Sequence, residues 1–323
     1  MEMKTKKVML FQNKSVSKYI FIGAMLAFPL IHFAIFWVYI NFNTFALTFQ
    51  KFNGEEFVFP GFAECFDNYE VIFRAFFMPR EAGGQIILQN ALLNSLYAFL
   101  INVVILMPLS IICAYVLSFR IKGEGIFRTV FYIPNIIAIT VMIMLYKYMF
   151  NDKFGPLYFM FKSFGVEKIW FDLSVESTTI WPLIIFYCIW AGLGVNMILM
   201  SSAISRIPPE ILESCQLDGI GFWHQLWSIV IPLVWSTIST VIVLGILAMF
   251  NFFIQPYLMA GADGGYEGQT MTIPIYIFNV VQSGSTAGYS TAATVGIFVS
   301  IIGMPIIFFT KWLTERFFRD VDF

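Results

Sequence analysis

The chain has 323 residues, of which 59% are hydrophobic and 12% are charged, and its mean hydropathy is +0.78. Soluble domains contain roughly 25% charged residues, so this composition excludes an ordinary soluble protein. The many bulky apolar residues also exclude a disordered chain. A net charge of −1 gives no support to nucleic-acid binding. We therefore start from an integral membrane protein.

Six apolar runs are long enough to cross a membrane, because a helix needs roughly 20 residues to span the hydrocarbon core. Apart from Arg128 near the start of the third run, they contain no Asp, Glu, Lys or Arg. The runs are Tyr19–Ile40, Ala91–Leu117, Phe127–Tyr146, Thr178–Ser202, Ser228–Met259 and Tyr289–Thr310. They predict an all-α, polytopic membrane protein with about six transmembrane helices.

The distribution of Lys and Arg predicts the orientation. With the N-terminus in the cytoplasm, 12 of these residues lie on the cytoplasmic side and 7 outside, as the positive-inside rule requires. Acidic residues gather in the first outer loop. An even number of spans then places both termini in the cytoplasm of a multi-pass protein of the cell membrane.

This topology divides the chain into five parts. They are a basic cytoplasmic tail (1–18), a first span (19–40), an acidic and aromatic extracytoplasmic cap (41–90), a core of five spans (91–311) and a cytoplasmic tail (312–323). The outer segment Lys147–Ser177 holds a short helix ending near Gly165. The four cysteines and two histidines have no spacing typical of a disulfide framework or a metal site, and we expect neither.

The spans lack the features of a self-sufficient pump. Ion-driven carriers keep ionisable side chains inside the bundle, and no such cluster is visible here. No G-x-x-x-x-G-K-[ST] phosphate loop occurs either, so any ATPase that drives transport must be a separate subunit. A passive channel remains an alternative at this point.

The sequence of the cytoplasmic loop 203–227 predicts a short helix at about residues 208–221. Pro208 and Pro209 suit the first helical turn, and Glu210 then lies near the positive helix end. Gly219 and Gly221 suit its end, since glycine adopts the left-handed cap conformation. We expect about three turns lying across the membrane face.

One side of this helix offers a contact surface. Glu213 and Leu217 are four residues apart and share a face, with Asp218 adjacent. Ser214 and Cys215 are small, so another protein could approach the backbone closely. The simpler alternative is an amphipathic connector whose carboxylates are solvated.

The run Glu213-Ser-Cys-Gln-Leu-Asp-Gly219, followed by Ile231-Pro-Leu233, resembles the "EAA" loop of ABC importer permeases, E-A-A-x-x-D-G-A and then L-P-L. Ser214, Cys215 and Ile220 depart from that pattern. The resemblance implies that the helix is a coupling helix docked on an ATPase. The coupling residues would be Glu213, Ser214, Cys215, Leu217, Asp218 and Gly219, with Glu213 facing a basic residue and Gly219 ending the helix.

Further fragments resemble the carbohydrate branch of this family, which includes the maltose and glycerol-phosphate permeases. They are Asp67-Asn-Tyr69, Asn94-Ser-Leu96, Arg128–Pro134, Ala191-Gly-Leu193 and, loosely, Gly261–Thr270. The resemblance runs from about Phe66 to the C-terminus and implies type I importer architecture. It implies a second permease of different sequence, an ATPase dimer that binds ATP and Mg, and an extracytoplasmic solute-binding protein. No cofactor is expected in this chain.

The same resemblance implies a solute site between the spans that flank the loop. Carried over by position, its residues are Cys188, Ala191, Gly192 and Val195 on the fourth span and Gly245, Ala248, Met249 and Phe252 on the fifth. Aromatic faces and amides suit sugars, so Trp190, Asn196, Asn251 and Gln255 are added candidates. Ordinary packing of Trp190 and a helix–helix hydrogen bond from Asn251 are the alternatives.

These observations predict a permease subunit that imports a carbohydrate. The small side chains suggest a wide cavity and hence an oligosaccharide. An ATP-independent carrier or channel is the main alternative. A membrane enzyme is a second one, with Glu55, Glu64, Asp67 and Asp172 for acid–base chemistry, although no spacing pairs these carboxylates.

Overall fold

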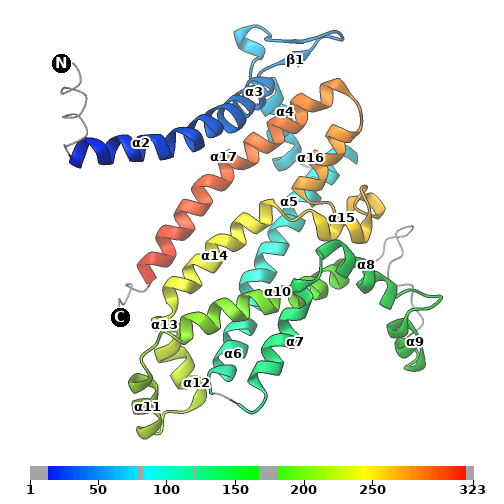
Figure 1. Ribbon diagram of the computed structural model, residues 1–323. Helices are drawn as coiled ribbons and strands as arrows, with labels where there is room; N and C mark the ends of the chain where they lie inside the picture. The colour runs from blue at the N-terminus through cyan, green and yellow to red at the C-terminus, as the bar shows by residue number, and fades with distance from the viewer. Residues whose placement is uncertain (1–13, 79–82, 120, 167–179, 318–323) are drawn as a thin grey trace, which may run out of the picture.

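The computed structural model describes residues 14–78, 83–119, 121–166 and 180–317 (Figure 1). In this part of the chain almost every element is a helix, and a single pair of two-residue strands joins Lys51–Phe52 (β1) antiparallel to Phe57–Val58 (β2). The all-α prediction is confirmed.

Within the described residues, four helices are long and apolar enough to cross a membrane. They are Lys18–Thr48, Ile87–Ser118, Ile180–Ile204 and Thr286–Arg316. Two sharply bent helix pairs, Glu124–Ile136 with Ile139–Met149 and Phe222–Leu233 with Trp235–Phe250, meet the same criteria. Counting each bent pair as one span gives six, in agreement with the sequence.

The third span, predicted as one helical run from Phe127 to Tyr146, is broken into two helices. Helices α7 (Glu124–Ile136) and α8 (Ile139–Met149) meet at 101°. Pro134 lacks the N–H that would continue the helical bonding, and Ile137 is extended, with φ −81° and ψ 140°. The chain therefore turns sideways at residues 137 and 138 and exposes this break.

The predicted fifth span, Ser228–Met259, is also wrong as a continuous helix. A π-helical turn (Leu226–Val230) and α13 (Ile231–Leu233) end at Val234, where the axis bends by 75°. Pro232 removes one backbone donor at this bend. Helix α14 (Trp235–Phe250) then ends before a separate helix, α15 (Ile254–Ala260).

The boundaries of the other spans also differ from the prediction. The first helix, α2 (Lys14–Phe33) with the π-helical turn Ala34–Val38 and α3 (Tyr39–Thr48), continues eight residues into the predicted cap. The second begins earlier, as α5 (Gly83–Ile101), π-helical turn Asn102–Leu106 and α6 (Met107–Ser118). The last, α17 (Thr286–Phe317), extends into the predicted tail.

The fourth span is α10 (Ile180–Ile204), and the fifth begins with α12 (Phe222–Gln225). The remaining helices lie between the spans: a 3-10 turn (Phe62–Glu64) and α4 (Asp67–Phe77) in the cap, α9 (Pro156–Ser163), α11 (Pro209–Leu217), a 3-10 turn (Tyr266–Gly268) and α16 (Ile273–Gln282). Gly165 follows α9 with φ +83°, as predicted for its end.

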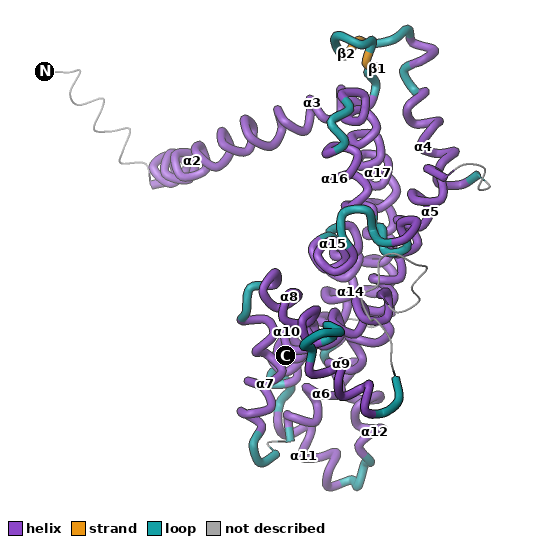
Figure 2. Tube along the Cα trace, turned by 90° about the vertical axis from the view of Figure 1, so that its right-hand side faces the viewer, coloured by secondary structure: helices purple, strands orange, loops and turns teal. Residues whose placement is uncertain are grey.

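The first helix stands apart from the bundle, as Figures 1 and 2 show. Every side chain from residue 18 to 43 is exposed, and these side chains are mostly apolar. At the Thr48 end of this helix, Asn68 on α4 connects the end of α3 to the beginning of α17. Its Nδ2 donates to the carbonyl oxygens of Thr48 (2.8 Å) and Gln50 (3.0 Å) and lies 3.3 Å from the Ser290 hydroxyl.

Three apolar clusters hold the bundle together. One lies near α11 and joins α6, α10 and the α12–α14 segment, around Tyr115, Met197 and Leu226. A second packs α8, α10 and α15 around Ile143, and a third packs α4, α5, α16 and α17. The fourth span, α10, contributes residues to the first and second clusters and so connects them.

Candidate functional site

Helix α11 lies at one end of the bundle, in the lower part of Figure 1. Pro209 is its first residue, as predicted, whereas Pro208 is the non-helical N-cap, and the helix ends at Leu217, earlier than the predicted end near residue 221. Gly219 follows the helix with φ +68°, and Ile220 N–H donates to the Cys215 carbonyl at 3.0 Å, which closes the helix end. The role predicted for Gly221 is wrong. It is extended, with φ −67° and ψ 156°, and caps the start of α12 instead.

The two faces of α11 differ sharply. Ile211 and Leu212 pack against the first apolar cluster, and Cys215 is 5% exposed. The predicted coupling residues Glu213, Ser214, Leu217, Asp218 and Gly219 are all exposed, and Leu217 is 89% exposed. Cys215 is therefore the one predicted coupling residue on the inner face, where its small side chain lets the helix lie close to the bundle.

A buried hydrogen bond connects the segment after α11 to the second span. The Tyr115 hydroxyl, on α6, donates to Gln225 Oε1 at 2.8 Å, and both residues are at most 3% exposed. The Phe222 ring lies against Tyr115, with centroids 4.9 Å apart. The hydrogen bond and the ring contact therefore attach α12 to α6.

A cavity of about 580 Å³ lies between the second, third, fourth and fifth spans. Ten of the twelve residues considered from sequence line it together: Cys188, Ala191, Gly192, Val195, Asn196, Gly245, Ala248, Met249, Phe252 and Gln255. Trp190 and Asn251 do not. Trp190 packs edge-on against Tyr187, and Asn251 Nδ2 donates to the Leu247 carbonyl of its own helix at 2.9 Å.

Sequence reasoning missed the residues that the broken helices bring to the cavity. The α7–α8 break contributes Pro134 to Ile139. Other missed residues come from the second span (Ala98, Ile101, Asn102 and Leu106) and from the unbroken α10 (Trp181, Ile185, Tyr187 and Ile189). The signals were present, because Pro134 followed by Asn135 interrupts an apolar run. Asn102 similarly lies at a π-helical turn in mid-span.

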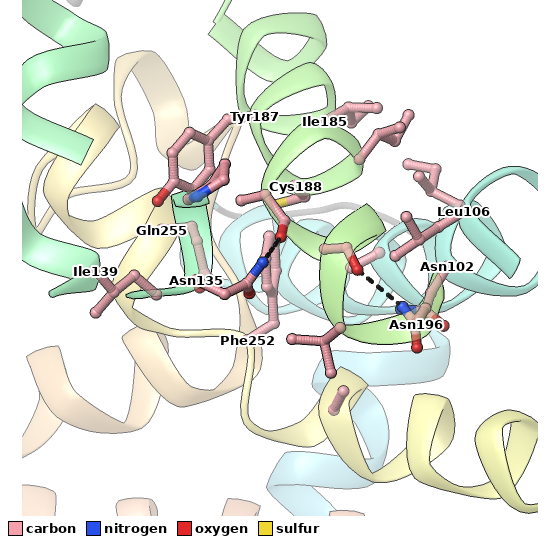
Figure 3. A pocket seen from close by; sticks show the side chains of 18 of the residues that line it. Asn102, Leu106, Asn135, Ile139, Ile185, Tyr187, Cys188, Asn196, Phe252 and Gln255 are labelled. Carbon is pink, nitrogen blue, oxygen red and sulfur yellow. Dashed lines mark hydrogen bonds between the residues drawn. The ribbon is translucent and has the colours of Figure 1, made fainter. Parts of the chain in front are cut away.

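Close approaches between helices shape the cavity. A Cβ at Gly194 would lie 2.3 Å from the Phe131 carbonyl oxygen, so α10 touches the α7 backbone there. Asn135 Nδ2 donates to the Ala191 carbonyl at 2.7 Å and fixes the break against α10 (Figure 3). A Cβ at Gly245 would lie 3.2 Å from Asn102 Oδ1. Glycines on α10 and α14 thus allow the helices to approach closely enough for Asn135 and Asn102 to lie in the cavity wall.

The wall is apolar, with a few amides and aromatic rings and no charged residue among those that line it. In Figure 3, Asn135 and Gln255 lie on one side of the view and Asn102 and Asn196 on the other. Amides hydrogen-bond hydroxyl groups, while Trp181, Tyr187 and Phe252 offer carbon surface. This chemistry suits an uncharged, hydroxyl-bearing solute.

The acid–base alternative is not supported by the cap. Lys51 Nζ binds Asp67 at 2.7 Å and Glu64 at 3.1 Å, and Arg74 pairs with Glu70. These carboxylates are thus engaged in exposed ion pairs. Asp172 lies outside the described residues, and the described residues hold no cluster of His, Cys, Asp and Glu suited to a metal.

Comparison with known proteins agrees with this architecture. Residues 106–322 match the family described as "Binding-protein-dependent transport system inner membrane component". The chain is 26% identical to the probable ABC transporter permease protein YurN of Bacillus subtilis over 66% of its own length and 73% of the relative's. It is 27% identical to the multiple sugar-binding transport system permease protein MsmF of Streptococcus mutans, over 65% and 70% of the two chains.

A third relative and a solved structure extend the comparison. The polygalacturonan/rhamnogalacturonan transport system permease protein YteP of Bacillus subtilis is 28% identical over 69% of each chain. A chain of a bacterial alginate ABC transporter, solved in complex with an alginate pentasaccharide-bound periplasmic protein, superposes with a TM-score of 0.76. That match covers 97% of this chain and all of the other, at 20% identity, and it shows a shared fold.

Proposed function

The chain belongs to the family of binding-protein-dependent transport system inner membrane components, and from this we propose that it is a permease subunit of an ATP-driven importer of oligosaccharides. The single observation that carries the proposal is the pairing of two features in one bundle. An uncharged cavity with amide and aromatic walls lies among the spans, and a short helix with an exposed contact face lies at the end of the bundle.

The cavity supports a carbohydrate as the solute. Its volume falls within the range of roughly 300–1,000 Å³ that is typical of ligand sites, and its polar groups are amides. MsmF is by name a permease of a multiple sugar-binding transport system, and YteP one of a polygalacturonan/rhamnogalacturonan transport system. Because no charged residue lines the cavity, we expect this chain to recognise hydroxyl groups and ring faces rather than carboxylates.

The exposed face of α11 supports coupling to a separate ATPase. Leu217 is a large apolar side chain with little contact in this chain, and Glu213 and Asp218 lie beside it. An apolar residue with flanking carboxylates is suited to a partner groove that carries basic residues. We propose that an ATPase dimer binding ATP and Mg docks here, and that this chain itself holds no nucleotide.

Further partners follow from the same proposal. One chain supplies one such helix, so a second permease, of different sequence, provides the contact for the other ATPase. An extracytoplasmic binding protein delivers the sugar. Both termini are cytoplasmic in this scheme. The junction at Asn68, where α3 ends and α17 begins, supports placing the two chain ends on one side of the membrane.

Charge reversal on α11 tests the proposal. In the purified assembly in proteoliposomes, Glu213→Lys should abolish ATP-driven oligosaccharide uptake while the protein still inserts. Glu315→Lys makes the same charge change at an exposed position on α17 rather than on α11 and should retain most uptake. Equal uptake by the Glu213→Lys variant, or wild-type uptake without ATP, would contradict the proposal and favour a self-sufficient carrier.

A further inference from the structure

Asn94, in the second span, is a buried amide that joins three separate parts of the chain. Its Nδ2 donates to the carbonyl oxygens of Gln269 (2.7 Å) and Met271 (2.8 Å). Its Oδ1 accepts the indole N–H of Trp181 at 2.9 Å. The residue is 5% exposed. Because two carbonyls require the NH₂ group and an indole requires the oxygen, these partners fix the orientation of the amide.

Gln269 and Met271 belong to a loop between α15 and α16, residues 261–272, that we call the glycine loop. Four of its glycines have positive φ, and Thr270 bonds back across it, its N–H and hydroxyl both donating to the Gly264 carbonyl. The loop is therefore a closed unit. The neighbouring residue of Asn94 adds a second attachment, since the Ser95 hydroxyl accepts the Ile273 N–H at 3.3 Å.

Trp181 carries this attachment to the cavity. Its ring lines the cavity and stacks on Phe252, with centroids 6.3 Å apart and planes at 25°. Phe252 is tied to the glycine loop as well, because the Thr272 hydroxyl donates to its carbonyl oxygen at 2.7 Å. Both rings of this aromatic pair are thus positioned by the same loop.

The hydrogen bond to Asn94 decides what Trp181 can offer to a solute. With the indole N–H bonded to the amide, the ring presents carbon surface to the cavity rather than a donor. Sugar rings bind such surfaces through their C–H faces. A side chain that is already fixed loses little rotational freedom when a solute binds, so a held indole discriminates between ring shapes better than a free one.

We propose that Trp181 is a solute-contacting residue that determines which sugar the cavity accepts, and that Asn94 is a positioning residue that ties its indole to the glycine loop. This inference rests on the proposed function and assigns roles to Trp181 and Asn94 within its cavity. It also explains two sequence fragments that coupling leaves unused, because Asn94-Ser95 and the glycine-rich segment turn out to bind each other.

The test compares uptake selectivity in variants of the whole assembly. We would measure kcat/KM for a panel of neutral oligosaccharides, maltotriose, cellotriose and raffinose, and of acidic ones, trigalacturonate and an alginate trisaccharide. Trp181→Ala should lower kcat/KM for the preferred sugar roughly 3- to 10-fold, as expected for a lost stacking contact, and flatten the preference. Trp37→Phe, on the exposed first helix and away from the cavity, is the control and should change neither.

Asn94 is tested by a double-mutant cycle. Asn94→Ala should flatten the preference as Trp181→Ala does, and should add nothing in the Trp181→Ala background, whereas a purely structural loss would add. Trp181→Phe keeps a ring but loses the N–H, so it should give an intermediate result even if Asn94→Ala fails to fold. The fluorescence of Trp181 is obtained by subtracting the signal of a Trp181→Phe variant in the same background. Acrylamide should quench this Trp181 fluorescence more strongly in Asn94→Ala than in the wild type, because the indole is more accessible.

The outcomes distinguish a failure of this inference from a failure of the proposed function. Sugar uptake by the wild type with a preference unchanged in Trp181→Ala overturns this inference and leaves the proposed function standing. Uptake of none of the panel by the wild-type assembly with ATP overturns the proposed function and this inference with it. Additive effects of Asn94→Ala and Trp181→Ala overturn the positioning role of Asn94.

Discussion

Asn135 Nδ2 donates a 2.7 Å hydrogen bond to the backbone carbonyl of Ala191, and this contact joins the break in the third span to the middle of the fourth. The break leaves the backbone of residues 137 and 138 outside any helix. Irregular backbone inside a membrane protein is tolerated where it lines a cavity or is bonded by protein, and here both conditions hold.

Removing this contact should loosen the cavity. We expect Asn135→Ala to cost about 1 kcal/mol of stability and to lower ATP-driven uptake severalfold, because the break loses its attachment. Thermal unfolding in detergent and uptake in proteoliposomes measure the two effects. Asn251→Ala is the control, since in the described part of the chain the Asn251 side chain donates to the Leu247 carbonyl of its own helix. Equal behaviour of the two variants would contradict this role.

Two glycines on α10 predict different consequences for the same substitution. A Cβ at Gly194 meets the Phe131 backbone oxygen at 2.3 Å, whereas one at Gly192 meets the end of the Leu106 side chain at 2.7 Å. Backbone cannot move aside but a leucine can rotate, so Gly194→Ala should destabilise the fold by about 1–3 kcal/mol and Gly192→Ala by less. Denaturation of both variants decides the matter, and the reverse order would refute the packing described.

The bond between Tyr115 and Gln225 should matter for stability at the α11 end. Gln225 Nε2 is buried and has no hydrogen-bond partner among the described residues, so Tyr115→Phe leaves the whole side-chain amide unbonded within this part of the chain. We expect a loss of about 1–3 kcal/mol. The double variant Tyr115→Phe, Gln225→Leu removes both polar groups and should recover part of that loss. If the double variant is no more stable than the single one, the bond is not the cause.

The cap should show a pH dependence at the alkaline end. Hydrogen bonds to Asp67 and then to Glu64 raise the pKa of Lys51 above its ordinary value of 10.5. Stabilisation from a raised lysine pKa is complete below about 10.5 and disappears as the pH rises through the folded-state value. The protection factor for hydrogen exchange across residues 51–77, which corrects for the base-catalysed intrinsic rate, should therefore fall above that pH. Lys51→Met should remove the pH dependence, and its persistence would assign it elsewhere.

Sequence reasoning located the spans because their signal is length and apolarity, and it placed the ends of α11 because Pro209 and Gly219 have strong positional preferences. It failed where a span is broken. Composition does not reveal whether Pro134 or Pro232 bends a helix, since the bend depends on what packs against it. The cavity residues contributed by those breaks, such as Asn135, were therefore missed, and the cap boundary shifted because residues 41–48 continue a helix.

Trp181 was missed for a related reason. A tryptophan at the start of an apolar run is typical of an interfacial anchor or a packing residue. Trp190, deeper in the run, was the tryptophan predicted to bind the sugar. Only the fold shows that Trp181 meets Asn94 from another span and faces the cavity. Contacts of this kind join residues 87 positions apart, and no local pattern encodes them.

The central claim is that the outer face of α11 seats an ATPase, and cross-linking from Leu217 tests it most directly. In a variant lacking the native cysteines, Leu217→Cys labelled with a maleimide-benzophenone, whose excited ketone inserts into C–H bonds of a neighbouring protein, should cross-link to an ATPase subunit on illumination, and the cross-link should stop ATP-driven uptake. Lys122→Cys, in the neighbouring connection between α6 and α7, gives the comparison and should yield much less product. An ATPase that binds the assembly but never cross-links at position 217, while uptake proceeds normally, would contradict the account.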